Sequence, residues 1–349
     1  MKEMNNLMNQ FINRQPEVLA QVLADSVSLE GLDLVGISDV IFIGSGSSIN
    51  AAEMAARYFE RYTRYQLHYF TPSAYAAWVA AGGGRHLVVV ISQTATSIAS
   101  MDCITLGQEQ GCPTLLISAT TDAQKRGQAD IFLDLFCPEE TIGPKSVGVM
   151  ATFTRLVQLA LALARISNAV TNAEVDQAFA QLQTCIEAIA TVKENSETWV
   201  QTHEQWATLP YVTVSADINM MAVANEGALK LLETLCKPAT AYEIGEFTHG
   251  PHRLINTSSF HILIANDAAD VLSPKVAQYI KKFTPNCLYL SLHDSDIDLV
   301  VTEDACGVEI LYSVVFQVLA NRLALLTGFN PDDKVHAEFF GFVGTKSGS

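Results

Sequence analysis

Short apolar runs that alternate with helical patterns limit most strongly what this chain can form. Runs of this length, rich in Val, Ile and Leu, are typical of parallel strands buried on both faces of a sheet. They occupy residues 39–45, 86–92, 113–119, 130–137, 211–216, 261–267 and 286–292. Helical patterns lie between them at 51–62, 97–110, 220–235 and 308–326, and residues from about 148 to 207 are helical throughout. The alternation predicts an α/β fold with two doubly wound parallel sheets joined by a helical connector.

Length and charge narrow the class of ligand. At about 150 residues per domain, 349 residues predict two domains, and 49% hydrophobic residues supply a sizeable core. The net charge of -16 disfavours a nucleic-acid or anionic-membrane partner. No run approaches the roughly 18 apolar residues of a membrane-spanning helix. A bound phosphate would therefore be held locally, by backbone N–H groups and hydroxyls.

The seven cysteines are scattered and never spaced as CxxC, which favours reduced, mostly buried thiols over disulfides or a zinc site. The start, MKEMNNLMNQ, lacks the apolar core of a signal peptide. His252, His261 and His293 show no metal-ligand spacing. We therefore expect a cytoplasmic protein that needs neither a metal nor a cofactor.

Two hydroxyl-rich loops follow neighbouring predicted strands. One is Gly44-Ser45-Gly46-Ser47-Ser48, and the other is SQTATS at residues 92–97. In doubly wound sheets, ligands bind outside the carboxyl ends of the strands, where helix N-termini offer N–H groups to an anion. Ser-rich turns at such places are also common helix caps. The pairing of two such loops favours a phosphate site, and Ile49 in place of a third glycine excludes the dinucleotide fingerprint.

Charge is concentrated in a second stretch, ALKLLETLCKPATAYEIGEFTHGP at residues 228–251. Glu226, Lys230 and Glu233 fall at i, i+4 and i+7 and share one helical face until Pro238 breaks the pattern. Taken alone, these residues also fit a solvated, salt-bridged helix face, with His249 in the loop that follows.

The pairing of GSGSS and SQTATS with EGALKLLE and AYEIGEFTHGP resembles the tandem sugar isomerase (SIS) domain family. This family includes the isomerase half of glutamine–fructose-6-phosphate aminotransferase and the fructoselysine-6-phosphate deglycases. The resemblance runs from Gln15-Pro16 to the long final helix, without a glutamine amidohydrolase domain. It implies two flavodoxin-like SIS domains, at residues 1–170 and 208–349, with a helical connector at 171–207.

The resemblance also implies roles for single residues. The phosphate-binding and sugar-binding positions are Gly46, Ser47, Ser48, Ser92, Gln93, Thr94, Ser97 and Ser146. The family's Gly-Glu pair inside the second loop is here Ala95-Thr96, a departure that would alter the loop. SADIN and AND replace the hydroxyl-rich loops in the second half, so one phosphosugar site per chain is expected.

For catalysis, the resemblance makes Glu233 the carboxylate that moves a proton between sugar carbons C1 and C2. Burial that raises its pKa would suit such a base. His249 matches the histidine that opens the sugar ring, in a site shared between the subunits of a homodimer or higher homo-oligomer. Phe339 stands where the aminotransferase has its Schiff-base lysine, with Lys334 and His336 nearby but out of register. Lys230, Lys145 and Arg253 are secondary candidates, the last two as contacts for a substrate carboxylate.

Three functions fit this pattern. The leading one is a deglycase that cleaves an Amadori-type 6-phosphofructosyl-amine to a hexose 6-phosphate and a free amine or amino acid. The second is an aldose–ketose or aminosugar phosphate isomerase that uses the same Glu233 and His249. The third is a non-catalytic sugar-phosphate sensor, which would not need a proton carrier.

Overall fold

The computed structural model describes residues 6–266 and 269–344, without the side chain of Phe340. Its contacts divide the chain into two compact units. The first-sheet unit comprises Glu17–Thr141, Val147–Gln177 and the chain from Lys334 onward. The second-sheet unit comprises the chain up to Pro16, Ile142–Ser146 and Ala178–Asp333. The two units are described separately below.

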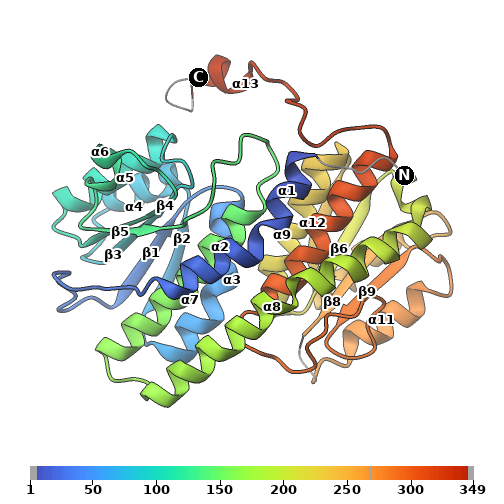
Figure 1. The fold of residues 1–349 in the computed structure, drawn as a ribbon, viewed down its shortest axis with the longest axis horizontal. Helices are drawn as coiled ribbons and strands as arrows, with labels where there is room; N and C mark the ends of the chain where they lie inside the picture. Colours follow the sequence, from blue (N-terminus) through green and yellow to red (C-terminus); the bar gives the residue numbers. More distant parts are fainter. Residues whose placement is uncertain (1–5, 267–268, 345–349) are drawn as a thin grey trace. The chain divides into compact units, whose positions relative to one another are not determined.

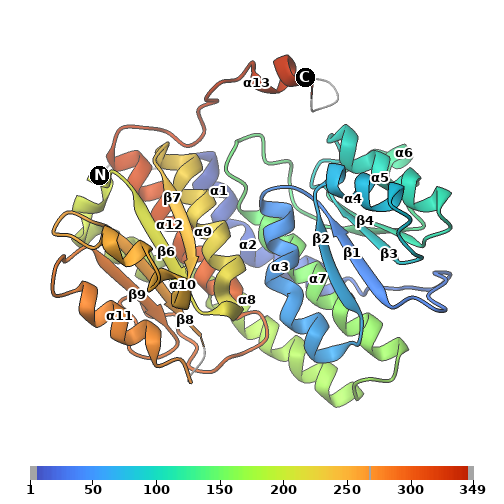
Figure 2. The same ribbon diagram turned by 180° about the vertical axis from the view of Figure 1, so that it is seen from behind.

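The first-sheet unit contains five parallel strands in the order β2-β1-β3-β4-β5. They are β1 (Asp39–Ile43), β2 (Gln66–Phe70), β3 (Leu87–Ile91), β4 (Thr114–Ser118) and β5 (Ile131–Asp134). Helices α3 (Ser47–Tyr62) and α7 (Val147–Ile166) cover one face, and α4 (Pro72–Ala80) and α5 (Ile98–Glu109) cover the other (Figures 1 and 2). This strand order is that of flavodoxin, so the predicted doubly wound sheet is confirmed.

The second-sheet unit repeats this arrangement with four parallel strands in the order β7-β6-β8-β9. They are β6 (Val212–Ala216), β7 (Ala239–Glu243), β8 (His261–Ala265) and β9 (Cys287–Ser291). Helices α9 (Met221–Leu235) and α12 (Val308–Leu326) pack together on one side, and α10 (Ile244–Phe247) and α11 (Leu272–Ile280) contribute to a core on the other. In chain order and position, β6, β7, β8 and β9 correspond to β1, β2, β3 and β4.

The remaining elements are short, apart from α8. They are α1 (Leu7–Asn13), α2 (Gln15–Ala24), α6 (Ala123–Arg126), α8 (Asn172–Thr202), η1 (Glu204–Thr208), η2 (Ile218–Met220), η3 (Pro251–Leu254) and α13 (Phe339–Val343). The helical stretch expected from about 148 to 207 is therefore present as α7, α8 and η1. Its middle part, α8, carries the chain from one unit to the other.

The apolar runs form strands because the positions of β3, β4, β6 and β8 are all buried. Sequence patterns missed β2 and β7, which lie at sheet edges and are only partly buried. An edge strand tolerates the polar residues of QLHYF and ATAYE, so neither segment shows a continuous apolar run.

Within the described part of the chain, two helices are long and apolar enough to cross a membrane by length and composition alone. They are Val147–Ile166 and Val308–Leu326, which form α7 and α12. Their apolar windows are 94% and 89% buried inside the structure. A helix that is apolar all round and buried by protein is the usual core helix of a globular domain, and that is how we interpret both.

Candidate functional site

The charged residues of α9 form a compact cluster. The Lys230 ammonium lies 2.5 Å from Oε2 of Glu233 and 3.4 Å from Oε1 of Glu226. The side chains of Lys230 and Glu226 are only 1% and 2% exposed, whereas that of Glu233 is 30% exposed. The i, i+4, i+7 spacing therefore places all three on one face, as predicted. The alternative of a solvated, salt-bridged helix face is wrong, because two of the three side chains are buried.

Burial and charge act on Lys230 in opposite directions. Loss of water lowers the pKa of its ammonium, but the adjacent Glu226 and Glu233 carboxylates outweigh this, so its pKa is raised above the ordinary value. Lys230 therefore stays charged at neutral pH. It donates a hydrogen bond to Oε2 of Glu233 and so orients a carboxylate that is partly open to solvent. A fixed, accessible carboxylate of this kind can accept a proton from a bound molecule.

The stretch after α9 is more ordered than a loop. Cys236 adopts a left-handed φ of 51° and ends the helix before Pro238, and β7 and α10 follow. The Glu243 side chain accepts the N–H of Glu246 at 2.9 Å and caps α10. Glu243 therefore has a structural role as the N-cap of α10. His249 lies on the turn after α10 and is exposed to solvent.

The first hydroxyl-rich loop lies at the carboxyl end of β1 and leads into α3. Gly44 is closely surrounded: a Cβ there would lie 3.0 Å from the Ser48 Cβ and 3.5 Å from the carbonyl oxygen of Ile91. Because Ile91 ends β3, the loop passes directly beside the second loop, as predicted from adjacent strand ends. Gly46 precedes Ser47 as the N-cap of α3 and contributes no side-chain cap.

The second loop is held by its own hydroxyl groups. Thr94 and Thr96 share a hydrogen bond of 2.8 Å between their hydroxyl oxygens. The Ser97 hydroxyl accepts the N–H of Ser100 and caps α5, so the cap interpretation holds for this serine. Ala95 takes a φ of 50° at the place of the family's glycine. The departure noted in the sequence is therefore accommodated by a strained alanine.

Gln93 is anchored by a carboxylate that the sequence did not single out. Its Nε2 donates to Oε2 of Glu140 at 2.8 Å, and Glu140 also accepts the N–H groups of Val147 and Gly148. Glu140 is 2% exposed and sits against the positive N-terminus of α7. A Cβ on Gly148 would lie 2.1 Å from the Gln93 Nε2, so this approach requires glycine. An acidic residue shortly before a long helix was the available signal.

The other predicted positions differ in accessibility. Ser146 is fully buried, and its carbonyl oxygen accepts a hydrogen bond from Gln317 at 3.4 Å. The Lys145 ammonium donates to the carbonyl oxygen of Ile142 at 2.9 Å. Arg253, in η3, is exposed, as are Lys334 and His336.

The predicted site residues thus form two groups. One group lies at the carboxyl ends of β1 and β3 in the first sheet and comprises Gly46, Ser47, Ser48 and the 92–97 loop. The α9 cluster, His249, Ser146, Lys145 and Arg253 belong to the second-sheet unit. Each group has a chemistry of its own: hydroxyl-rich loops at strand ends in one, and an oriented carboxylate in the other.

We compared the sequence and the fold of this chain with those of known proteins. No protein-family model matches the chain. Glutamine–fructose-6-phosphate aminotransferase (isomerizing) of Aeropyrum pernix is 23% identical over 351 residues, which cover 94% of this chain and 55% of that protein. The chain therefore spans about half the length of this curated relative.

Crystal structures of other proteins resemble the chain along most of its length. A candidate phosphosugar isomerase of Clostridium difficile has a TM-score of 0.87 at 21% identity and covers 97% of this chain and 99% of its own. The chain has the tandem SIS fold. A glucosamine-6-phosphate deaminase of Thermotoga maritima shares it with a TM-score of 0.79 at 18% identity, covering 94% of this chain and 97% of its own. Within this fold, the motifs quoted above fall on β1–α3, β3–α5, α9 and the β7–α10 stretch that follows it.

Proposed function

We propose that this tandem SIS protein is a sugar-phosphate enzyme in which Glu233 moves a proton between C1 and C2 of the sugar. The carrying observation is the α9 cluster, in which a buried lysine holds a partly exposed carboxylate in one orientation. A ligand-binding module has no need of an oriented proton acceptor, which disfavours the sensor. The names of the relatives, all sugar-phosphate proteins, support a phosphosugar as the ligand.

For the reaction, we propose deglycation of a 6-phosphofructosyl-amine. Glu233 would take a proton from C1, which bears the amine, and the C2 carbonyl oxygen would gain a proton to give an enaminol. Return of a proton to C2 yields an imine at C1. Water then adds to C1, and the C–N bond breaks, so a ketoamine and one water give a hexose 6-phosphate and a free amine. His249 would open the sugar ring before the first step.

The tail of the chain supports deglycation over amine transfer. Phe339, at the place of the family's Schiff-base lysine, is 55% exposed and cannot form an imine with a keto sugar. A deglycase needs no such lysine, because its substrate already carries the amine. The isomerase alternative is favoured by the name of the Clostridium difficile protein, and it would use the same carboxylate.

A substrate panel separates these reactions. Purified protein would be offered 6-phosphofructosyl derivatives of lysine, glutamate and aspartate, and separately fructose 6-phosphate with or without ammonia. Release of glucose 6-phosphate from an Amadori compound supports deglycation. Turnover of free hexose or aminohexose phosphates alone would contradict deglycation and support isomerisation. Tight binding without any turnover would overturn the enzymatic proposal.

Phosphate binding by Ser48, Thr94 and Ser97 can be tested without disturbing α5. Aspartate and asparagine both replace serine well as helix N-caps. Ser97→Asp should therefore keep the fold but repel a phosphate, whereas Ser97→Asn should bind nearly as well as the parent. Calorimetry with fructose 6-phosphate measures both variants. Equal affinity of the aspartate and asparagine variants would remove Ser97 from the phosphate site.

We further propose that the protein acts in the cytoplasm as a homodimer, with the exposed His249 reaching the site of the other subunit. Burial of six of the seven free cysteines suits a reducing compartment. Sedimentation of the active protein as a monomer would contradict the shared site.

A further inference from the structure

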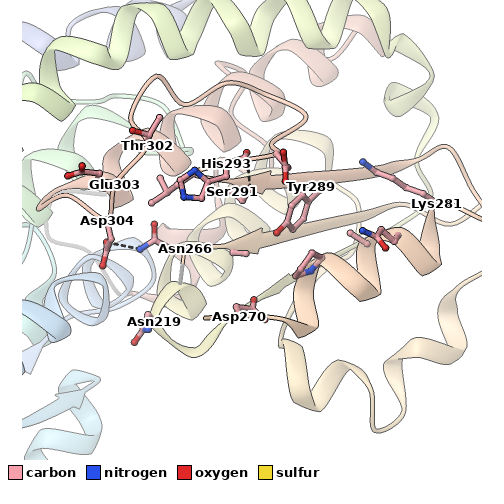
Figure 3. Close-up of a pocket in the computed structure, with 16 residues that line it drawn as sticks. Asn219, Asn266, Asp270, Lys281, Tyr289, Ser291, His293, Thr302, Glu303 and Asp304 are labelled. Carbon is pink, nitrogen blue, oxygen red and sulfur yellow. Dashed lines mark hydrogen bonds between the residues drawn. The ribbon is translucent and has the colours of Figure 1, made fainter. Parts of the chain in front are cut away.

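A pocket of about 750 Å³ lies in the second-sheet unit, beyond the carboxyl ends of β8 and β9 (Figure 3). It is bordered by Asn219 after β6, Asn266 after β8 and His293 after β9. The positions after β6 and β8 correspond to the hydroxyl-rich loops after β1 and β3 of the first sheet, and the position after β9 corresponds to the end of β4. Doubly wound sheets bind ligands at this place, outside the carboxyl ends of the strands.

The chemistry of this pocket is opposite to that of an anion site. Four carboxylates line it, those of Asp270, Asp294, Glu303 and Asp304. The lining lysine, Lys281, is paired with Asp296 at 2.7 Å. The excess of negative charge favours a cationic ligand.

An unpartnered acceptor group points to what that cation must offer. Asn266 is only 7% exposed, and its Nδ2 donates to Oδ1 of Asp304 at 2.7 Å. This hydrogen bond, drawn in Figure 3, fixes the orientation of the Asn266 amide. The other amide atom, Oδ1, is buried and accepts no hydrogen bond. Oδ2 of Asp270 is likewise buried and unpartnered, while its Oδ1 accepts the N–H groups of Leu272 and Ser273. A buried acceptor without a donor destabilises the folded state, and a donating ligand would remove this cost.

A metal ion fits these groups less well than an organic cation. Among residues 6–266 and 269–344, no three His, Cys, Asp or Glu side chains are grouped so that they could hold a metal. The pocket volume also far exceeds that of an ion. A primary ammonium group carries one positive charge and three donors, which suits several oxygens spread around a larger space.

We propose that this pocket is a second ligand site, which binds a small molecule bearing a primary ammonium group. Asn266 Oδ1 and Asp270 Oδ2 accept its N–H groups, and the surrounding carboxylates balance its charge. The site is separate from the proposed catalytic cluster. Asn219 comes just before α9, and Glu233 lies in the last turn of that helix. The rise along α9 from its first residue to Glu233 is about 18 Å. None of Glu226, Lys230 and Glu233 lines the pocket.

The test uses the full chain and the probe pentane-1,5-diammonium, with pentane-1,5-diol as its neutral counterpart and tetramethylammonium as a cation without donors. We expect saturable binding of the diammonium alone, measured by calorimetry. Asp270→Asn keeps the oxygen that accepts the N–H groups of Leu272 and Ser273 but replaces the unpartnered acceptor and removes the charge. This variant should weaken binding by about tenfold or more, as expected for a hydrogen bond to a charged group.

Two further variants make the outcome decisive. Glu303→Gln, at an exposed lining position, should also weaken binding, so the test does not rest on one substitution. Glu194→Gln removes one charge from the exposed side of α8, outside the pocket, and should leave the affinity unchanged. Equal binding of tetramethylammonium, equal affinity of all variants, or no saturable binding would each overturn the proposal. None of these results bears on turnover of a phosphosugar.

Discussion

Lys230 holds together the charges of α9. Sequence spacing alone predicted that Glu226, Lys230 and Glu233 share a face, since a helix repeats every 3.6 residues. It did not predict which of them are buried, because burial depends on α12 packing against α9. The cluster is therefore an ionic core feature with one exposed end, and removal of its cation should be costly.

Lys230→Met would leave the 2%-exposed Glu226 carboxylate without its cation. We expect a loss of about 3–5 kcal/mol in the free energy of unfolding, as found when one partner of a buried ion pair is removed. Urea unfolding measures this loss. The double variant Glu226→Gln/Lys230→Met should recover much of it. A single variant as stable as the parent would show that the pair is not a buried ionic unit.

His261 provides a prediction on pH. It lies buried between the hydroxyl groups of Thr213 and Ser259, at 2.7 and 2.8 Å, and burial lowers its pKa to about 4. The folded state thus favours the neutral ring, while the unfolded chain binds a proton near pH 6.5. The stability contributed by His261 is present above about pH 6.5 and is lost as the pH falls toward 4.

Relative to His261→Gln, the parent should lose about 2 kcal/mol of unfolding free energy between pH 7 and pH 5. Urea unfolding at both pH values measures the difference, and the glutamine variant cancels the contributions of carboxylates elsewhere. Parallel pH dependence of the two proteins would mean that His261 titrates normally in the folded state.

At the scale of elements, the end of α9 decides where Glu233 stands in its last turn. Pro238 predicted that the helix stops, but the stop itself is made two residues earlier by Cys236 in a left-handed conformation. That conformation costs an L-residue about 1–2 kcal/mol and suits glycine. The edge strands β2 and β7 were not predicted, because their partial exposure permits polar residues.

Cys236→Gly should therefore raise the free energy of unfolding by about 1 kcal/mol, because it relieves the backbone strain and the side chain that it removes is exposed. Thermal or urea unfolding under reducing conditions measures the gain. Cys236→Ala is the matched control, since it removes the thiol and keeps the strain. An alanine variant as stable as the glycine variant would assign the effect to the thiol.

At the scale of the molecule, apolar periodicity predicted both parallel sheets because their central strands are buried on both faces. The hydroxyl-rich loops were predictable from their positions after β1 and β3. The position of Glu140 before a long helix was a signal for an N-terminal contact, but its bond to Gln93 and the pocket beside Asn266 were not predictable, because each depends on side chains brought together from separate segments. The same strand order therefore presents hydroxyl groups at the carboxyl ends of the strands in the first sheet. At the corresponding strand ends of the second sheet it presents carboxylates.

The proton transfer assigned to Glu233 is tested most directly by comparing Glu233→Gln with the parent on whichever member of the phosphosugar panel is turned over. The variant keeps the size of the side chain but cannot accept a proton, so kcat should fall by about 10²–10⁴. Calorimetry should show phosphosugar affinity within a few-fold of the parent, since the loops proposed to bind phosphate belong to the first-sheet unit. A variant that retains kcat would contradict the role of Glu233 as the proton carrier.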